Sequence, residues 1–370
     1  RNSLSTGFLA SSLLWVRENE PEIYAACRYV LLPKDYIRLK MCGEIGTDFS
    51  DASGTLLFDT AKRDWAWEMI ENLGLDRAIF PELHESYAKA GKITAECAAQ
   101  TGLREGTTVA YGGGDTLMHE VGTGLIAEDS PWVSNIGTSC QVSCASAAPP
   151  FDPLLRANTF CHAKGDLWML MSASLAGGAA MQWAKKRLFP EFTDFEQMNA
   201  MAQGVRAGSD GLIFLPYLNG ARSPENDPHA RAIFFGISLD HDKAHFVRAV
   251  MEGVIYSLMH NYETIRAVTH SDTRAMVASG GGAKGDLLLQ MQADAFDRPI
   301  YTTRESEQSC VGAAVTAALC TGAYGSYAEA CGELVKFNER IVEPIAQNAR
   351  IYHEQFEIYK ELYARNRTLF

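Results

Sequence analysis

The chain has 370 residues, of which 33 are Lys or Arg and 45 are Asp or Glu, so its formal net charge is −12. This length exceeds what one hydrophobic core usually serves, and two domains are expected. Hydrophobic residues at 47% and charged residues at 21% exclude a disordered chain. The acidic balance argues against broad nucleic-acid binding, which needs clustered Lys and Arg. No apolar run reaches the roughly 18 to 20 residues that span a bilayer, so no membrane partner is expected.

The N-terminal apolar segment, residues 8–16, faintly resembles a secretory signal peptide. It has no small-residue cleavage site and continues directly into charged residues, so we interpret it as an amphipathic helix, with Pro21 opening the next one. The nine cysteines form no Cys-x-x-Cys pair and are interpreted as buried, reduced thiols. Both features favour a cytoplasmic protein.

The rest of the chain alternates between helical and strand patterns. Helical spacing covers residues 8–32 and 60–74, with a polar, turn-rich stretch between them. The apolar run 107–111 ends in glycines, which is typical of a buried strand feeding a loop, and residues 117–125 read as a helix. A second half begins near residue 130, with strands expected over residues 132–136, 140–144, 167–171 and 276–279, and helices over residues 175–187, 194–206, 243–268, 284–296, 311–319 and 346–367. The helix 311–319 is rich in small residues, which suits close packing, and the alternation predicts an α/β fold.

The first glycine loop is Gly112-Gly113-Gly114-Asp115-Thr116. Glycines allow a backbone or a ligand to approach closely, and open α/β sheets bind ligands at the carboxyl ends of their strands. A carboxylate placed there can accept a proton from a substrate hydroxyl, so Asp115 is a candidate general base. The alternative is that Asp115 is only a helix N-cap.

The second loop is Gly137-Thr138-Ser139, between two expected strands. Its backbone N–H groups and two hydroxyls could cradle a phosphate. The alternative is a simple hairpin turn without a ligand.

The third loop runs from Ser279 to Asp286 and contains Gly280, Gly281 and Gly282. Glycines between a strand and a helix N-terminus suit an anion or a nucleotide ring. The loop is neither a Walker A motif nor a Gly-x-Gly-x-x-Gly fingerprint, and close helix–strand packing is the alternative. Together, the three loops match phosphoryl transfer, which needs clamping of charge and a base for the acceptor hydroxyl.

Some conspicuous residues have simpler interpretations. His162 is expected to lie in the core or in a cleft wall. Trp65, Trp67 and Trp183 occupy positions of helical spacing and are interpreted as packing residues.

Several longer motifs resemble one family. They are Leu31–Arg38, Gly43-Glu44, Thr47–Thr55, Phe160–Ala163, Phe214–Gly220 with Arg222 and Pro224, Asp227-Pro228, Ala230-Arg231, and Phe235–Ile237 with His245–Gly253. In these motifs, over nearly its whole length, the chain resembles the FGGY family of carbohydrate kinases and, within it, the xylulose kinases.

The resemblance implies an α/β, two-domain, actin/hexokinase-like (ribonuclease H-like) fold with an active-site cleft. It implies that residues 1–118 are the later part of a sugar-binding N-terminal domain and residues 119–370 a nucleotide-binding C-terminal domain. It also implies an ATP-dependent kinase of a ketopentose, D-xylulose, with Mg²⁺ accompanying ATP and a possible homodimer. The implied site residues are Asp115 as catalytic base, Thr116 beside the sugar, and Gly137, Thr138, Ser139, Gly178, Gln182, Gly281, Gly282 and Asp286 around ATP.

Two departures from the family pattern affect the predicted activity. Thr116 stands where family members usually have Asn or Gln, which leaves the exact sugar open, with ribulose or gluconate as alternatives. The family's early Asp-x-Gly-Thr phosphate loop does not precede Leu13. We therefore expect that about the first hundred residues of a complete member are missing, that the N-terminal domain is incomplete, and that this chain alone has little kinase activity. A truncated, non-catalytic homologue is the remaining alternative.

Overall fold

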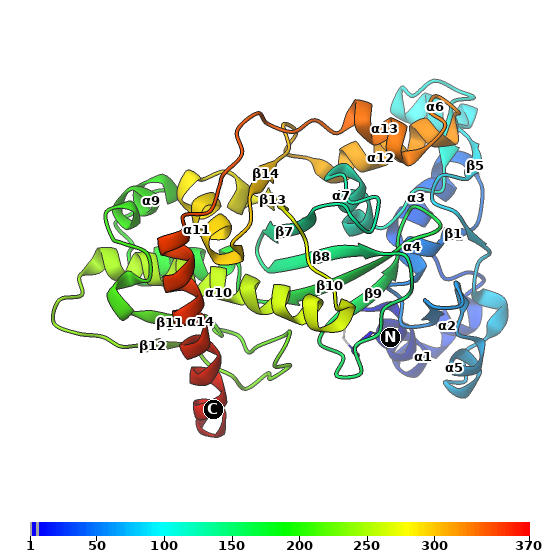
Figure 1. Cartoon of the computed structure of the whole chain (residues 1–370). Helices are drawn as coiled ribbons and strands as arrows, with labels where there is room; N and C mark the ends of the chain where they lie inside the picture. The colour runs from blue at the N-terminus through cyan, green and yellow to red at the C-terminus, as the bar shows by residue number, and fades with distance from the viewer. Residues whose placement is uncertain (1, 5–6) are drawn as a thin grey trace. The chain divides into compact units, whose positions relative to one another are not determined.

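The computed structural model describes residues 2–4 and 7–370 and divides the chain into two compact units. Unit 1 consists of Arg1–Ser130, Ala145–Leu170 and Glu307–Lys336. Unit 2 consists of Pro131–Cys144, Met171–Ser306 and Phe337–Phe370. The chain therefore crosses between the units several times, as the colour gradient of Figure 1 allows the reader to follow.

Unit 1 consists mostly of helices with short two-stranded sheets. Its helices are α1 (Leu9–Asn19), α2 (Pro21–Ala26), α3 (Pro33–Cys42), α4 (Phe49–Ala52), α5 (Trp67–Asn72), the 3-10 helix η1 (Arg77–Ile79), α6 (Ala95–Thr101), α7 (Asp115–Gly122), α12 (Gln308–Cys320) and α13 (Tyr327–Leu334). Its strands are β1 (Thr47–Asp48), β2 (Phe58–Asp59), β3 (Asp64–Trp65), β4 (Leu83–His84), β5 (Lys89–Lys92), β6 (Thr108–Ala110) and β9 (Asn158–Cys161). β1 and β4 pair in parallel, whereas β2 pairs with β3 and β5 with β6 in antiparallel fashion.

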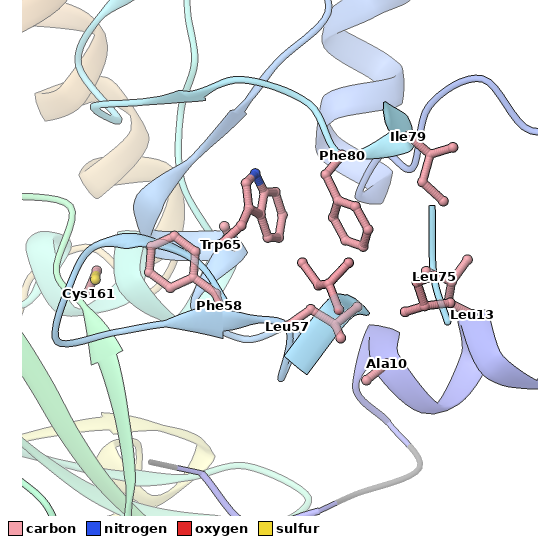
Figure 2. Packing of buried hydrophobic residues seen from close by; sticks show 11 residues of the cluster. Ala10, Leu13, Leu57, Phe58, Trp65, Leu75, Ile79, Phe80 and Cys161 are labelled. Carbon is pink, nitrogen blue, oxygen red and sulfur yellow. The ribbon is translucent and has the colours of Figure 1, made fainter. Parts of the chain in front are cut away.

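An aromatic cluster forms one core of unit 1 (Figure 2). The Phe58 and Trp65 rings pack edge to face at 6.0 Å, and Phe80 lies 5.0 Å from Trp65. Leu13 of α1 belongs to the same cluster, so the amphipathic interpretation of the N-terminal helix is confirmed. The helix expected over residues 60–74 is wrong for its first part. Phe58 and Trp65 are paired across the β2–β3 hairpin, which buries both rings, and α5 begins only at Trp67.

The helix that begins at Asp115 is held by close packing between α7 and α12. Gly122 and Gly312 lie where the two helices meet, and a side chain on either would overlap the backbone of the facing helix. The small residues of the predicted helix 311–319 therefore serve the expected close contact. The strand expected at 107–111 exists as β6, although its residues are half-buried instead of buried.

One six-stranded sheet has the order β14-β13-β7-β8-β10-β9. Its strands β14, β13 and β7 belong to unit 2 and β9 to unit 1, while β8 and β10 run from one unit into the other. β7 pairs in parallel with β13 and antiparallel with β8, and β13 pairs in parallel with β14. The strands assigned to unit 2 are β7 (Trp132–Ile136), β8 (Cys140–Ser146), β10 (Trp168–Ser174), β11 (Ile213–Leu215), β12 (Ile233–Phe235), β13 (Met276–Gly280) and β14 (Ile300–Thr302).

The helices of unit 2 follow the predicted positions closely. They are α8 (Gly178–Arg187), α9 (Phe195–Gln203), α10 (Lys243–Thr269), α11 (Asp286–Phe296) and α14 (Ala346–Asn366), with the 3-10 helices η2 (Ser209–Gly211), η3 (Gly281–Ala283) and η4 (Arg367–Leu369). α10 begins with a capping box between Asp242 and His245, which satisfies the first amides of the helix. In Figure 1 the red helix α14 lies beside α10 and α11. Within the described part of the chain, we find no helix long and apolar enough to cross a membrane.

Candidate active site

Asp115 is the first residue of α7 and is exposed. Its carboxylate Oδ1 accepts a 2.6 Å hydrogen bond from the Thr116 amide, and the Thr116 hydroxyl lies 3.3 Å from the same oxygen. The N-cap position belongs to Gly114, so the alternative in which Asp115 is only an N-cap is wrong. An acidic side chain in the first turn is favoured by the helix dipole, and here it stays open to an incoming hydroxyl.

The turn before Asp115 is fixed by a buried polar network. The Gly114 amide donates a 3.2 Å hydrogen bond to the Ser50 hydroxyl oxygen. Ser50 donates its own hydroxyl to Asp48, whose same carboxylate oxygen accepts a 2.7 Å bond from Ser86. Asp48 and Ser50 are buried, so the start of α7 is tied to a rigid support.

A cavity of about 770 Å³ lies entirely within unit 2, at the edge formed by the ends of β7 and β13. Six residues predicted to surround ATP line it: Gly137, Thr138, Gly178, Gln182, Gly281 and Gly282. These residues come from three separate segments, so the fold brings the second and third glycine loops together around one space. Its volume is within the range of ordinary small-molecule sites.

Two predicted ATP residues are absent from this lining. The Ser139 carbonyl oxygen instead accepts a 2.9 Å hydrogen bond from the Gly137 amide and closes the turn. The Asp286 carboxylate accepts a 2.6 Å hydrogen bond from the exposed Arg340. Both loops thus contribute their glycines to the wall, whereas Ser139 and the Asp286 carboxylate lie outside it.

The walls contain residues that sequence reasoning did not select. Ile136, Met181, Phe195 and Leu288 provide apolar surface, and Lys186, Arg187 and Lys284 provide positive charge. Trp183 also lines the cavity, while its ring stacks parallel to Phe214 at 6.1 Å, so its interpretation as a packing residue was only partly right. The run of three basic residues at 185–187, which begins two residues after Trp183, is the sequence signal that could have indicated a site for phosphate.

The two antiparallel strands β7 and β8 do form the hairpin that was the simpler interpretation of Gly137-Thr138-Ser139. The three residues are exposed, and α8 begins against them: the Gly178 amide donates a 2.7 Å bond to the Gly137 carbonyl oxygen and the Ala179 amide a 3.0 Å bond to that of Thr138. A Cβ atom on Gly178 would lie 2.6 Å from the Gly137 oxygen, so glycine is required for this close approach. The hairpin is therefore an integral part of the cavity.

His162 is fully buried, as expected for a core position, and its Nδ1 accepts a 3.0 Å hydrogen bond from the Lys164 amide. Burial lowers the pKa of His162 to about 4, so the ring is neutral at pH 7. Among the residues that the structure describes, no group of three or more His, Cys, Asp or Glu side chains is arranged to hold a metal ion.

Sequence comparison relates both parts of the chain to one family. The N-terminal domain profile of the FGGY family of carbohydrate kinases matches residues 1–122, and the C-terminal domain profile matches residues 133–320. A xylulose kinase of Bacillus subtilis (strain 168) is 35% identical over 369 residues, covering 100% of this chain and 73% of that protein.

Comparison with solved structures leads to the same family as the sequence comparison. The crystal structure of a xylulose kinase from Rhodospirillum rubrum has a TM-score of 0.90 at 28% identity and covers 100% of this chain and 74% of that chain. Two structures from Lactobacillus acidophilus, described as a xylulose kinase and as a gluconate kinase, each have a TM-score of 0.90 at 26% identity, over 97% of this chain and 72% of theirs. These likenesses confirm the expected two-domain, actin/hexokinase-like α/β fold.

Proposed function

Because the chain belongs to the FGGY family of carbohydrate kinases, which use ATP, we propose that it phosphorylates a ketopentose, D-xylulose, on one of its hydroxyl groups. The observation that carries the proposal is the cavity of unit 2, where two glycine loops and three cationic side chains surround a space suited to a nucleotide. Xylulose kinases at 30–35% identity along nearly the whole chain support the choice of sugar.

In the proposed reaction, Asp115 acts as general base. The sugar hydroxyl oxygen attacks the γ-phosphorus in line, its proton passes to the Asp115 carboxylate, and the bond between the γ-phosphorus and the bridging oxygen breaks to release ADP. The exposure of Asp115 at the N-terminus of α7 supports this role. We place Thr116 beside the sugar, where its hydroxyl can orient the reacting group.

On the nucleotide side, we assign the phosphates to Gly137, Thr138 and Ser139 and the adenosine to Gly281, Gly282 and Asp286, with Gly178 and Gln182 between them. Lys186, Arg187 and Lys284 offer cationic partners for the phosphate oxygens. The donor is proposed to be the Mg²⁺ complex of ATP, since Mg²⁺ commonly binds through substrate phosphates and water. When bound with ATP, Mg²⁺ would supply positive charge that offsets the charge on the transferred group.

The remaining assignments are proposals of the same kind. We propose residues 1–118 as part of the sugar-binding domain and residues 119–370 as the nucleotide-binding domain, in a cytoplasmic enzyme that forms a homodimer. Size-exclusion chromatography with light scattering tests the dimer directly, because a monomeric mass at micromolar concentration would contradict it.

An ADP-release assay with a sugar panel tests the function. The natural full-length protein is incubated with MgATP and D-xylulose, ribulose or gluconate, and we expect the highest kcat/KM with D-xylulose. Gluconate is the second candidate, because one similar structure is described as a gluconate kinase and Thr116 departs from the family pattern. Release of ADP with none of the sugars would favour a non-catalytic homologue.

A further inference from the structure

We propose that Asp51, held by Lys34 beside the turn that carries Asp115, is a titratable positioning residue that controls the charge next to the catalytic base. This inference rests on the proposed function of Asp115. It concerns a cluster of charged side chains in unit 1 that the reaction as described above does not use.

Lys34 is the centre of the cluster. Its Nζ lies 2.5 Å from Asp35 Oδ1, 2.9 Å from Asp48 Oδ1 and 3.6 Å from Asp51 Oδ2. Burial opposes the charge of Lys34, but the three carboxylates outweigh burial and raise its pKa, so the ammonium remains charged. One cation therefore faces three carboxylates, and a second cation, Arg38, lies 2.7 Å from Asp35.

Asp51 is the carboxylate of the cluster that reaches the catalytic turn. Asp35 and Asp48 have side chains that are 0% exposed, whereas the Asp51 side chain is 26% exposed. A Cβ atom built on Gly114 would lie only 3.3 Å from Asp51 Oδ1, so this oxygen lies against the residue that precedes Asp115. The cluster thus presents one partly open carboxyl group beside the proposed base.

Burial, together with the charges around it, leaves Asp51 protonated below neutral pH. Burial is the largest cause that raises the pKa of Asp51, Lys34 lowers it and the neighbouring carboxylates raise it, and the combined result is a pKa of about 7. Four charged groups act on Asp51: Lys34, Asp35, Asp48 and Asp115. Two further groups stand next to these, since Arg38 contacts Asp35 and His119 follows Asp115 by one helical turn. The Asp115 charge is one of the groups that raise the pKa of Asp51, so ionisation of Asp51 places a second negative charge beside the turn that carries Asp115.

A purely structural role is the competing explanation. In that case Lys34 would only neutralise buried carboxylates. Variants of Lys34 and Asp115 would then change the stability of the protein without changing the midpoint at which Asp51 titrates. The two roles are separated by measuring protonation directly and by using variants that shift it in opposite directions.

The first measurement is a carbon-13 NMR titration of aspartate side-chain carboxyls in the full-length protein, with the Asp51 signal assigned by its loss in Asp51→Asn. In Lys34→Gln we expect the Asp51 midpoint to rise by about one pH unit, because an attractive charge is removed. In Asp115→Asn we expect it to fall, because a repulsive charge is removed. Glu105→Gln, an exposed carboxylate away from the cluster, is the matched control and leaves the midpoint unchanged.

The second measurement is kcat/KM for the sugar at saturating MgATP from pH 5.5 to 8.5. We expect a rise near pH 7 in the wild type that is absent in Asp51→Asn and present in Glu105→Gln.

If Lys34→Gln does not fold, Asp51→Asn and Asp115→Asn still decide the matter. Absence of turnover with every sugar rejects the proposed function, while the NMR midpoints still test the pair. An Asp51 midpoint that is unchanged in Asp115→Asn, or profiles that coincide in wild type and Asp51→Asn, overturns the inference.

Discussion

The Gly178 amide donates a 2.7 Å hydrogen bond to the Gly137 carbonyl oxygen, and this bond joins the start of α8 to the exposed hairpin of the cavity. A Cβ atom on Gly177 would lie 2.3 Å from the Ser139 carbonyl carbon and oxygen, so this position also has no room for a side chain. The position of the hairpin therefore depends on two consecutive glycines at the start of a helix.

The first prediction concerns Gly178→Ala. The new Cβ would lie 2.6 Å from the Gly137 oxygen, so the hairpin must move and the hydrogen bond must weaken. We expect a loss of about 1 to 2 kcal/mol in the free energy of unfolding and about a tenfold higher KM for ATP. Urea unfolding and initial-rate kinetics measure both effects.

Gly332→Ala is the control for this substitution, because Gly332 lies in α13 and nothing stands within 4 Å of its added Cβ. It is expected to leave the KM for ATP unchanged and to stabilise the helix slightly. Equal KM values for ATP in Gly178→Ala and Gly332→Ala would contradict the assignment of the hairpin to the nucleotide site.

The second prediction concerns Asp115→Asn. The amide cannot accept the hydroxyl proton, so kcat is expected to fall by about 10² to 10⁴. The Kd for ATP should stay within about threefold, because the cavity of unit 2 is not changed. Coupled kinetics and isothermal titration calorimetry provide the two measurements, and Asp129→Asn, an exposed carboxylate after α7, should retain full activity. Normal turnover by Asp115→Asn would refute its role as base.

The third prediction uses Trp183 as a reporter. Its ring lines the cavity, so ATP should change its fluorescence, and the change should disappear in Trp183→Phe while ATP still binds. Trp183→Ala removes apolar wall area and is expected to raise the Kd for ATP about tenfold. Trp67→Phe, outside the lining of this cavity, is the control that keeps the signal. A signal that survives in Trp183→Phe would place the nucleotide elsewhere.

The fourth prediction is a loss of stability in acid. Burial lowers the pKa of His162 from the ordinary 6.5 to about 4, so the unfolded state binds more protons between these two values. Stability is therefore complete above pH 6.5 and falls as the pH drops toward 4, by up to about 3 kcal/mol for this group.

His162→Gln is expected to flatten this pH dependence of the unfolding free energy, as measured by chemical denaturation between pH 4 and 7. His229→Gln, at an exposed position, should leave it as it is in the wild type. If the unfolding free energy has the same pH dependence in the wild type, His162→Gln and His229→Gln, then His162 does not take up a proton on unfolding.

Long periodic segments were predictable from the sequence, since the helix expected over residues 243–268 is α10 (Lys243–Thr269). The glycine loops were also recognisable, because strand ends followed by glycines have few structural uses. The hairpin at Phe58–Trp65 was not predictable from helical spacing, because the packing of two distant aromatic rings decides it.

The same reason explains what was missed at the site. Lys34 and Asp51 stand within the family-like motifs, but no spacing rule indicates that they lie beside residue 115. Trp183 and the basic residues after it were assigned to packing or left unassigned, because only the fold turns that side of α8 toward the cavity.

The close packing of α7 on α12 also bears on how the protein is made. The helix that begins at Asp115 leaves the ribosome long before α12, where Gln308 lies against Gly122 and Gly312 lies against Met118. During synthesis the helix that carries the proposed base therefore lacks its packing against α12 until most of the chain has emerged. A nascent chain that stalls before α12 would leave the apolar side chains of Met118 and Val121, which pack against Val315, open to solvent and to chaperones.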